Sequence, residues 1–277
     1  MFLGYNTNGF AHHRLTDAVD LLAEMGYPGI GLTIDVHHLN VFAESYELEL
    51  ALFAAQTGRH ELRTAIETGS RFLLNPKVKH QPTLLSADPA ERAVRYDYLS
   101  RCVDVAMRLR SDCVSFWSGT PTDDAGPKVW MSRLVDRCVR LADEAAAKRV
   151  RLAFEPEPGM FIDTMAKFAE LHAAVNHPAF GLTLDVGHLV CMGEIPIRTH
   201  VMQWKHVLWN VHIDDMRRGV HDHLMFGEGE VDFAECFDAL REANYGGGVY
   251  VELSRHSYDA VNAAKKSLAF LEMVTNR

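Results

Sequence analysis

Short apolar runs alternate with longer amphipathic stretches along the whole of this sequence. The short runs have the length and apolar content of buried strands, and each is followed by a stretch long enough for a helix. We expect eight strands, at Phe2–Tyr5, Gly29–Ile34, Arg63–Glu67, Cys113–Trp117, Val150–Glu155, Gly181–Asp185, Val207–His212 and Gly248–Leu253.

The intervening stretches predict helices. Between Leu15 and Met25 apolar residues recur every three or four positions, and Gly26 follows as a C-terminal stop. Asp232 and Asp259 are placed to cap the last two helices. The expected helices are Leu15–Met25, Glu47–Thr57, Pro89–Leu109, Val129–Lys148, Thr164–Val175, Thr199–Lys205, Asp232–Ala243 and Asp259–Val274.

This order of elements predicts the fold class. Eight strand–helix pairs in succession favour a parallel sheet, and eight strands close such a sheet into a barrel. The 277 residues match the size of one barrel. We therefore expect an α/β protein whose residues 1–277 form a single (β/α)8 barrel, with its active site at the C-terminal ends of the strands. A doubly wound open sheet is the alternative.

Four consecutive predicted strands end in ionisable residues, which are Glu155, Asp185, His212 and Glu252. The carboxyl ends of the strands meet at the mouth of a barrel, so these side chains should converge. Unpaired carboxylates in such contact raise one another's pKa and cost stability, which a divalent cation prevents. The sequence thus predicts one bound metal. Its oxygen-rich ligands favour Mn²⁺, our first choice, with Mg²⁺, Co²⁺ or Zn²⁺ as alternatives.

Two neighbouring residues extend this candidate site. Glu157 shares the face of Glu155, so either could be the ligand, and we prefer Glu155 because it ends the apolar run. Glu157 is then a substrate contact or a structural residue. His188 follows Asp185 by three residues, and Gly187 permits a turn that brings the imidazole over the mouth. We expect His188 to bind a substrate hydroxyl, with helix capping as the alternative.

The loop after His212 is long and charged, and loops of this kind often carry function. Arg217 and Arg218 are expected to bind a substrate oxygen or to pair with the two aspartates before them. His221 and His223 follow, and His223 is a further candidate substrate contact. The two histidines could also form a second metal site or a proton relay, although surface histidines are common.

Composition narrows the function classes. The formal net charge of −9 argues against nucleic acid as a partner, because such a surface repels phosphate backbones. The five scattered cysteines favour reduced thiols in a cytoplasmic protein. We expect no signal peptide and no membrane span. Motifs of nucleotide-binding proteins and serine hydrolases do not occur in the sequence.

The second half of the chain resembles a known family in the motifs FEPEPG, LDVGH, VHIDDMRRG, FGEGEVDF and VELS. These are similar to the xylose-isomerase-like TIM-barrel superfamily, and within it to the sugar (phosphate) isomerases and epimerases that include the ketose 3-epimerases. The resemblance implies that the four strand-end residues bind the metal. It also implies that Glu155 and Glu252 move a proton and that His188 and Arg218 hold the substrate. The prolines around Glu157 and the charged loop depart from the usual epimerase pattern, which leaves the substrate open.

We therefore expect a metal-dependent isomerase or epimerase of a sugar, cyclitol or related polyol, acting by abstraction and return of an α-proton. A lyase or dehydratase with the same enolate chemistry is the nearest alternative. A metal-dependent phosphodiesterase of the endonuclease IV type, with more than one metal, and a non-catalytic binding or trafficking barrel are two others. The expected partner is a small molecule, and the chain is a possible homo-oligomer.

Overall fold

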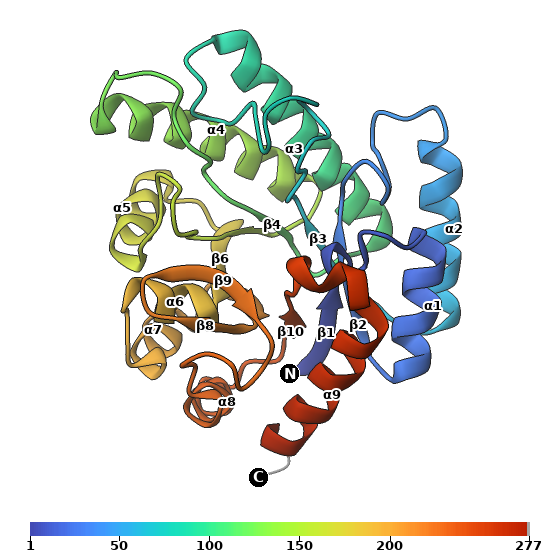
Figure 1. Cartoon of the computed structure of the whole chain (residues 1–277). Coiled ribbons are helices and arrows are strands. Elements are labelled where there is room, and N and C mark those ends of the chain that lie inside the picture. Colours follow the sequence, from blue (N-terminus) through green and yellow to red (C-terminus); the bar gives the residue numbers. More distant parts are fainter. Residues whose placement is uncertain (276–277) are drawn as a thin grey trace.

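Eight parallel strands form a closed barrel, which confirms the predicted fold class (Figure 1). The computed structural model describes residues 1–275. Around the barrel the strands follow the order β1-β10-β7-β6-β5-β4-β3-β2, so each is paired with two neighbours. Their bounds are β1 (Phe2–Asn6), β2 (Gly29–Thr33), β3 (Arg63–Glu67), β4 (Val114–Phe116), β5 (Leu152–Phe154), β6 (Phe180–Asp185), β7 (Leu208–Ile213) and β10 (Gly248–Val251).

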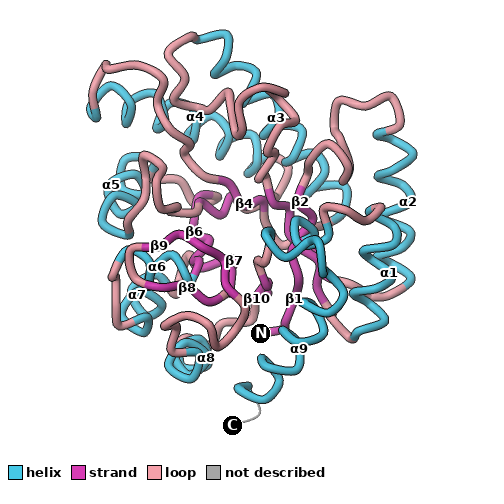
Figure 2. The backbone as a smooth tube through the Cα atoms, viewed as in Figure 1, coloured by secondary structure: helices cyan, strands magenta, loops and turns pink. Residues whose placement is uncertain are grey.

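Helices surround the barrel, and Figure 2 shows them as a ring outside the central strands. Gly26 ends the first helix in the left-handed conformation, as expected. Asp232 caps the eighth by accepting a hydrogen bond from the backbone N–H of Glu235. The helices are α1 (Leu15–Met25), α2 (Tyr46–Arg59), α3 (Pro89–Leu109), α4 (Pro127–Ala147), α5 (Met165–Val175), α6 (Val186–Met192), α7 (Ile197–Trp204), α8 (Phe233–Glu242) and α9 (Ala260–Thr275).

Several short elements were not expected from the sequence. Helix α6 begins directly after β6, without a loop. The 3₁₀ helix η1 (Thr7–Phe10) follows β1, and η2 (Ser254–Asp259) leads directly into α9. Asp259 therefore ends η2, and its carboxylate accepts a hydrogen bond from the side chain of Asn262.

The charged loop after β7 folds as an antiparallel hairpin of β8 (Asp215–Arg217) and β9 (Val220–Leu224). Asp215 anchors the chain that returns from this hairpin. Its carboxylate accepts hydrogen bonds from the backbone N–H groups of Gly227, Gly229 and Val231, at 2.8, 2.9 and 3.0 Å. The segment predicted as a loop is thus tied to the end of β7 at several points.

Strand β7 contains one extra residue relative to β6. The register between them shifts at Leu182 and Thr183, where Trp209 is the additional residue. Trp209 packs against the apolar cluster inside the barrel. Asn210 and His212 are also buried, and Asn210 reaches across the interior to a side chain of β3. Because of this bulge, Asn210 and His212 can face the interior although Trp209, directly before Asn210, also packs there. The bulge thus brings His212 to the site.

The barrel interior changes from apolar to polar along its length. The ring of Tyr250 packs against small side chains, among them Ala153. Gly4 leaves room for this ring, because a Cβ atom there would lie 2.3 Å from it. Thr183 donates a hydrogen bond of 2.9 Å to Ser115, which lines a cavity at the mouth. The interior is therefore packed beneath a polar opening.

The cysteine side chains and the lengths of the helices relate to two predictions made from composition. All five cysteines are buried free thiols, in agreement with the prediction of reduced thiols. Within residues 1–275, none of the helices has the length and apolar character needed to cross a membrane.

Candidate metal centre

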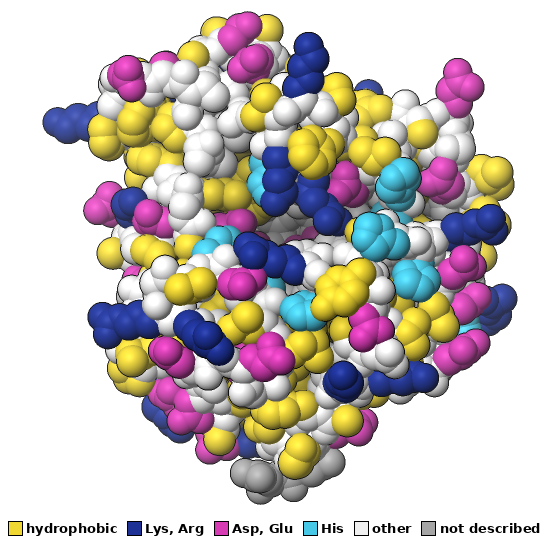
Figure 3. Space-filling model, in the orientation of Figure 1, with side chains coloured by type: hydrophobic (Ala, Val, Ile, Leu, Met, Phe, Trp, Pro, Cys, Tyr) yellow, Lys and Arg dark blue, Asp and Glu magenta, His cyan; other side chains and the backbone are white. Residues whose placement is uncertain are grey.

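A cavity of about 460 Å³ opens at the carboxyl ends of the strands. Acidic and imidazole groups line it, and Figure 3 shows Lys and Arg side chains beside the central hollow. A groove of about 550 Å³ beside α1 and α2 contains none of the candidate metal-binding groups found in the described part of the chain. Chemistry in (β/α)8 barrels takes place at the strand ends, so the mouth cavity is the candidate site.

Four strand ends deliver ionisable side chains to one point of this cavity. They are Glu155 directly after β5, Asp185 at the end of β6, His212 in β7 and Glu252 directly after β10. Each offers one ligand atom, and these atoms all lie within 4.8 Å of one another. A single divalent cation can be reached by all four, as the sequence predicts.

His212 lies at the centre of this group and is only 1% exposed. Its Nδ1 is 3.0 Å from Oε1 of Glu155 and 2.8 Å from Oε2 of Glu252. Its Nε2 is 3.0 Å from Oε1 of Glu67, the last residue of β3. When Glu67 accepts the Nε2 proton, the ring is fixed and Nδ1 becomes the nitrogen that can bind a metal.

Two asparagines near the end of β1 hold Glu252. The amide of Asn8 donates a hydrogen bond of 2.8 Å to Oε1, and that of Asn6 donates one of 3.4 Å to Oε2. Because Asn8 binds Oε1, the second oxygen of Glu252 is the one that faces His212. The carboxylate is therefore held in one orientation by residues that the sequence analysis did not single out.

Asp185 is 2% exposed, and its two carboxylate oxygens have different surroundings. Oδ1 accepts a hydrogen bond of 2.8 Å from the backbone N–H of His188, so Asp185 caps the N-terminus of α6. The buried Oδ2 has no hydrogen-bond partner among the described residues. A buried carboxylate oxygen without a partner costs free energy, which a cation compensates. The residues of this site therefore fit a divalent metal.

Burial and mutual charge shift the pKa values of these groups in different directions. Burial raises the pKa of Glu155 to about 8, although the charge of His212 opposes it. Burial also acts on Glu252, but its interactions with His212 and other histidines lower the pKa below the ordinary carboxylate range. Burial lowers the pKa of His212, but the carboxylates of Glu67, Glu155 and Glu252 outweigh it and raise the pKa well above its usual value. A proton on His212 thus compensates part of the charge that a metal would compensate.

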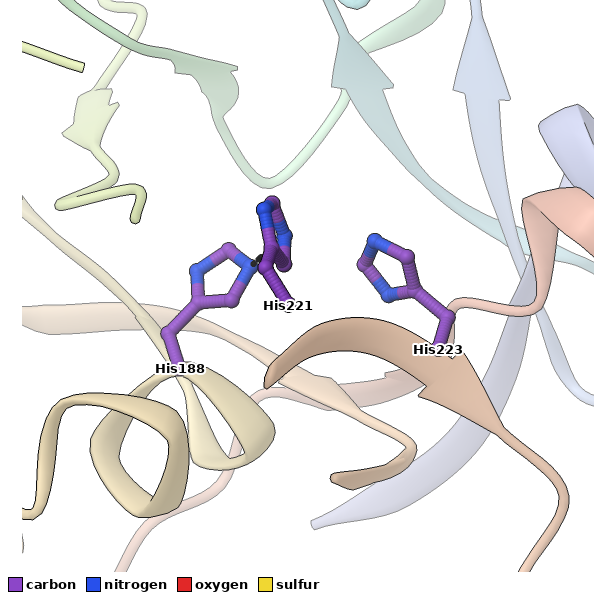
Figure 4. A group of neighbouring side chains, drawn as sticks. All are labelled: His188, His221 and His223. Carbon is purple, nitrogen blue, oxygen red and sulfur yellow. Dashed lines mark hydrogen bonds between the residues drawn. The ribbon is translucent and has the colours of Figure 1, made fainter. Parts of the chain in front are cut away.

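Most of the expected substrate contacts lie at or beside this group. Glu157 lines the cavity but is not one of the four converging residues. Burial, followed by the charge of Glu155, raises its pKa well above the ordinary value. His221 and His223 line the cavity from β9, and His188 packs against both from α6 (Figure 4).

Two of the expected substrate contacts, His188 and Arg218, are not among the residues that line this cavity. His188 contacts His221, which does line it, and the other residue is Arg218. It is exposed at the turn between β8 and β9, and its guanidinium group lies against Gly193 at the end of α6. Arg217 donates two hydrogen bonds, of 2.8 and 3.1 Å, to the backbone oxygen of Glu228. The loop forms a hairpin, so its turn carries these arginines away from the strand ends.

Sequence reasoning missed Glu67 and the basic residues of the cavity wall. Glu67 ends the third predicted strand, so the rule applied to the later strands could have found it. Arg71 and Lys79 line the cavity from a loop, and Arg255 lines it from η2. The positions of these basic residues in the sequence do not indicate that they line the cavity, because the folded path of the segments between strands and helices decides where they lie.

Together, the fold and the site define a (β/α)8 barrel with three carboxylates and an imidazole converging at its mouth. Residues 19–273 match the family model described as "Xylose isomerase-like TIM barrel". The chain therefore belongs to this family, as the sequence motifs suggested.

Individual proteins of known name are similar to this chain over most of its length. L-ribulose-5-phosphate 3-epimerase UlaE of Salmonella heidelberg (strain SL476) is 23% identical over 237 residues, which are 84% of this chain and 80% of that protein. The structure of D-allulose 3-epimerase from Methylomonas sp. in complex with D-allulose has a TM-score of 0.77 at 21% identity, covering 99% of this chain and 96% of that one. The IOLI protein with a bound zinc atom has a TM-score of 0.80 at 20% identity, covering 100% and 98%. At these identities the structural comparisons confirm the fold.

Proposed function

We propose that this protein is a metal-dependent isomerase or epimerase of a sugar, cyclitol or related polyol. The observation that carries the proposal is the convergence of Glu155 and Glu252 on the same nitrogen of His212. They come from strands on opposite sides of β7 in the barrel. Two carboxylates beside one metal-binding point can provide a base and an acid for the same carbon atom. The similarity to a sugar-phosphate 3-epimerase supports this reaction class.

In this proposal the metal is held by Glu155, Asp185, His212 and Glu252. Mn²⁺ is the first choice, and Mg²⁺, Co²⁺ and Zn²⁺ are alternatives. A divalent cation held by these residues would polarise the oxygens of a ketose and so acidify the adjacent C–H group. Glu67 holds the ring of His212 in place through Nε2.

Glu155 and Glu252 transfer the proton. One carboxylate removes it from the carbon next to the carbonyl, and the other returns a proton to the opposite face, which inverts that centre. Asn8 keeps Oε1 of Glu252 occupied, so Oε2 is the oxygen available for this step.

Glu157 and His223 line the cavity, and we propose that they hold substrate hydroxyl groups. His188 supports the same wall, because its ring contacts His221. Arg218 is left out of this set, because it is not among the residues that line the cavity. The acidic net charge of the chain favours a small molecule over nucleic acid as the partner. This function also accords with the expected cytoplasmic location.

Hydrogen exchange at carbon tests this proposal. The purified protein is incubated with Mn²⁺ and a panel of ketoses and ketose phosphates in heavy water, and deuterium at the α-carbon is followed by NMR. We expect exchange together with a new epimer. Glu155→Gln and Glu252→Gln should each slow exchange by at least about 100-fold, because each removes a proton-transferring group. Glu170→Gln, an exposed residue of α5, is the matched control.

The products separate this function from its alternatives. A lyase or dehydratase would release an unsaturated product instead of an epimer. A phosphodiesterase of the endonuclease IV type would cleave a phosphate diester without exchange at carbon. Full exchange in both Gln variants would refute the roles assigned to Glu155 and Glu252.

A further inference from the structure

The mouth cavity has an acidic floor and a basic side wall. The glutamates that line it lie at the ends of strands or shortly after them. Arg71 and Lys79 line the same cavity from the loop between β3 and α3. Strand β3 lies opposite β7 in the closed barrel, so this loop rises on the side of the mouth that faces the strand of His212.

The backbone of this loop brings its two basic residues together. The backbone N–H of His80 donates a hydrogen bond of 2.6 Å to the backbone oxygen of Arg71, so the chain at Lys79 lies beside the chain at Arg71. Burial lowers the pKa of His80 to about 3, and the positive charges of Lys79, Arg95 and Arg71 act in the same direction. The ring of His80 is therefore neutral, and three cations lie near it.

Arg95 of α3 holds this loop from behind and is only 3% exposed. Its guanidinium group donates hydrogen bonds of 2.9 Å to the backbone oxygen of His80, 3.0 Å to that of Pro82 and 2.9 Å to Oγ of Ser70. The guanidinium carbon lies 4.5 Å from the ring centroid of Trp117, which lines the cavity. Burial lowers the pKa of Arg95 to about 10, so the group stays charged at pH 7. Arg95 thus holds both branches of the loop that carry the basic side chains.

Ion pairs do not cancel the positive charge of this wall. Nε of Arg71 is 3.1 Å from Oδ2 of Asp35, which leaves its two terminal nitrogens without a partner among residues 1–275. Lys79 and Arg95 have no ion-pair partner in the same part of the chain. A buried cation without a carboxylate costs free energy, and an anion in the cavity would compensate part of that cost. In a chain of net charge −9, such a wall favours an anion at this place over the rest of the surface.

We propose that the wall formed by Arg71, Lys79 and Arg95 binds an anionic group of the substrate. Arg71 and Lys79 contact this group, and Arg95 is a positioning residue that holds their loop and adds its charge. The reacting carbons lie at the metal and the wall stands across the mouth, so the anionic group is at the far end of the sugar. A phosphate ester and a carboxylate share this chemistry, because both present anionic oxygens to N–H donors. The inference rests on the proposed function for the position of the reacting carbons, and it narrows the substrate class to acidic sugar derivatives.

Three ligands that differ only at C6 test this inference, which are D-fructose, D-fructose 6-phosphate and D-fructuronate. Isothermal titration calorimetry in the presence of Mn²⁺ measures their dissociation constants. We expect at least one of the two anions to bind at least about 10-fold more tightly than fructose, with a difference that falls as the salt concentration rises. A gain confined to the phosphate or to the carboxylate identifies which of the two groups the wall binds.

Variants of the wall should remove this preference. Lys79→Ala and Arg71→Gln should each reduce it at least about fivefold and leave the affinity for fructose within about twofold. Lys77→Ala is the matched control and should keep the preference, because Lys77 is exposed in the same loop and is not among the residues that line the cavity. Circular dichroism shows whether each variant is folded.

The positioning role of Arg95 has a separate test. Arg95→Lys keeps the charge but cannot make all three hydrogen bonds of the guanidinium group. We expect it to reduce the preference for the anions without changing the affinity for fructose. Equal weakening of all three ligands would show a merely structural role.

The outcomes distinguish the anion site from the proposed function. Equal affinities for fructose and both anions, no binding of any of the three, or a preference that survives in Lys79→Ala and Arg71→Gln would overturn the anion site. An equal loss of preference in Lys77→Ala would also overturn it. Exchange at the α-carbon without any preference for anions would refute the site and leave the proposed function standing. A preference that depends on Lys79, with no exchange in any ketose of the panel, would support the site and refute the proposed function.

Discussion

Single residues decide the chemistry at the mouth of this barrel, and His212 is the residue on which the others depend. Its two nitrogens have different partners, with Glu67 on one side and a pair of carboxylates on the other. Glu155 and Glu252 were identified from the sequence because each follows an apolar run. Glu67, the partner of Nε2, was not identified from the sequence. It comes from β3, which is four strands away from β7 around the barrel, and sequence order does not indicate which distant carboxylate will contact the imidazole.

Replacing Glu67, which contacts Nε2 of His212, should weaken metal binding without removing a metal ligand. In Glu67→Gln the amide replaces the carboxylate that accepts the Nε2 proton, so the ring is held less firmly and Nδ1 is less basic. We expect Mn²⁺ affinity to fall about 10- to 100-fold. Isothermal titration calorimetry measures this change, with Glu170→Gln as the control. Unchanged affinity would show that Glu67 does not position the ring.

The protons held by this group predict how metal binding depends on pH. The pKa of His212 is well above its usual value and that of Glu155 is about 8, so both groups hold protons in the metal-free protein at pH 7. A metal must displace these protons, and affinity should therefore rise as the pH increases from 6 to 8. Titrations in buffers of different ionisation enthalpy should show release of roughly one proton or more per metal. Affinity that stays constant over this range would contradict the prediction.

At the scale of elements, the strands and long helices could be predicted because apolar periodicity and capping residues mark them. Helix α3 has its predicted bounds, and its capping residue Asp88 accepts a hydrogen bond from Ala90. The hairpin of β8 and β9 could not be predicted in this way, because β8 has only three residues and β9 is mostly polar and at most partly buried. Helix α6 has seven residues and begins without a loop, so no boundary signal separates it from β6. The placement of Arg218 depended on that hairpin.

Asp215 should be the residue that holds the hairpin segment in place. It is buried and accepts three backbone N–H groups, which in Asp215→Ala would all lose their partner. We expect this substitution to lower the free energy of unfolding by about 3 kcal/mol. Urea denaturation measures the change. The exposed Asp238→Ala should alter it by about 0.5 kcal/mol or less, and an equally small effect of Asp215→Ala would contradict the anchoring role.

At the scale of the whole molecule, barrel closure explains why strand-end residues could be predicted to converge. The carboxyl ends of all strands in a closed parallel barrel lie at the same mouth, so residues far apart in the sequence meet there. Asn8 and Glu252 are hydrogen-bonded although they come from opposite ends of the chain. Residues outside the strands, such as Arg71 in a loop and Arg255 in η2, have no such geometric guarantee, and the sequence therefore does not indicate their place in the cavity.

A metal that links strands from across the barrel should stabilise the whole fold. Mn²⁺ at 100 times its dissociation constant should add about 2.7 kcal/mol to the free energy of unfolding. This corresponds to a rise of roughly 5 °C or more in the unfolding temperature. Differential scanning fluorimetry with Mn²⁺ and then with excess chelator measures the shift. Asp185→Asn removes one ligand and should lose most of it, and an equal shift in this variant would place the stabilising ion elsewhere.

The central claim is that Glu155, Asp185, His212 and Glu252 hold one metal together. An anomalous difference map from crystals soaked in Mn²⁺ tests it most directly. The account predicts a strong peak within coordinating distance of all four side chains, at about 2.0–2.6 Å from their ligand atoms. A map with no peak between these side chains, or with Mn²⁺ bound only at another place, would contradict it.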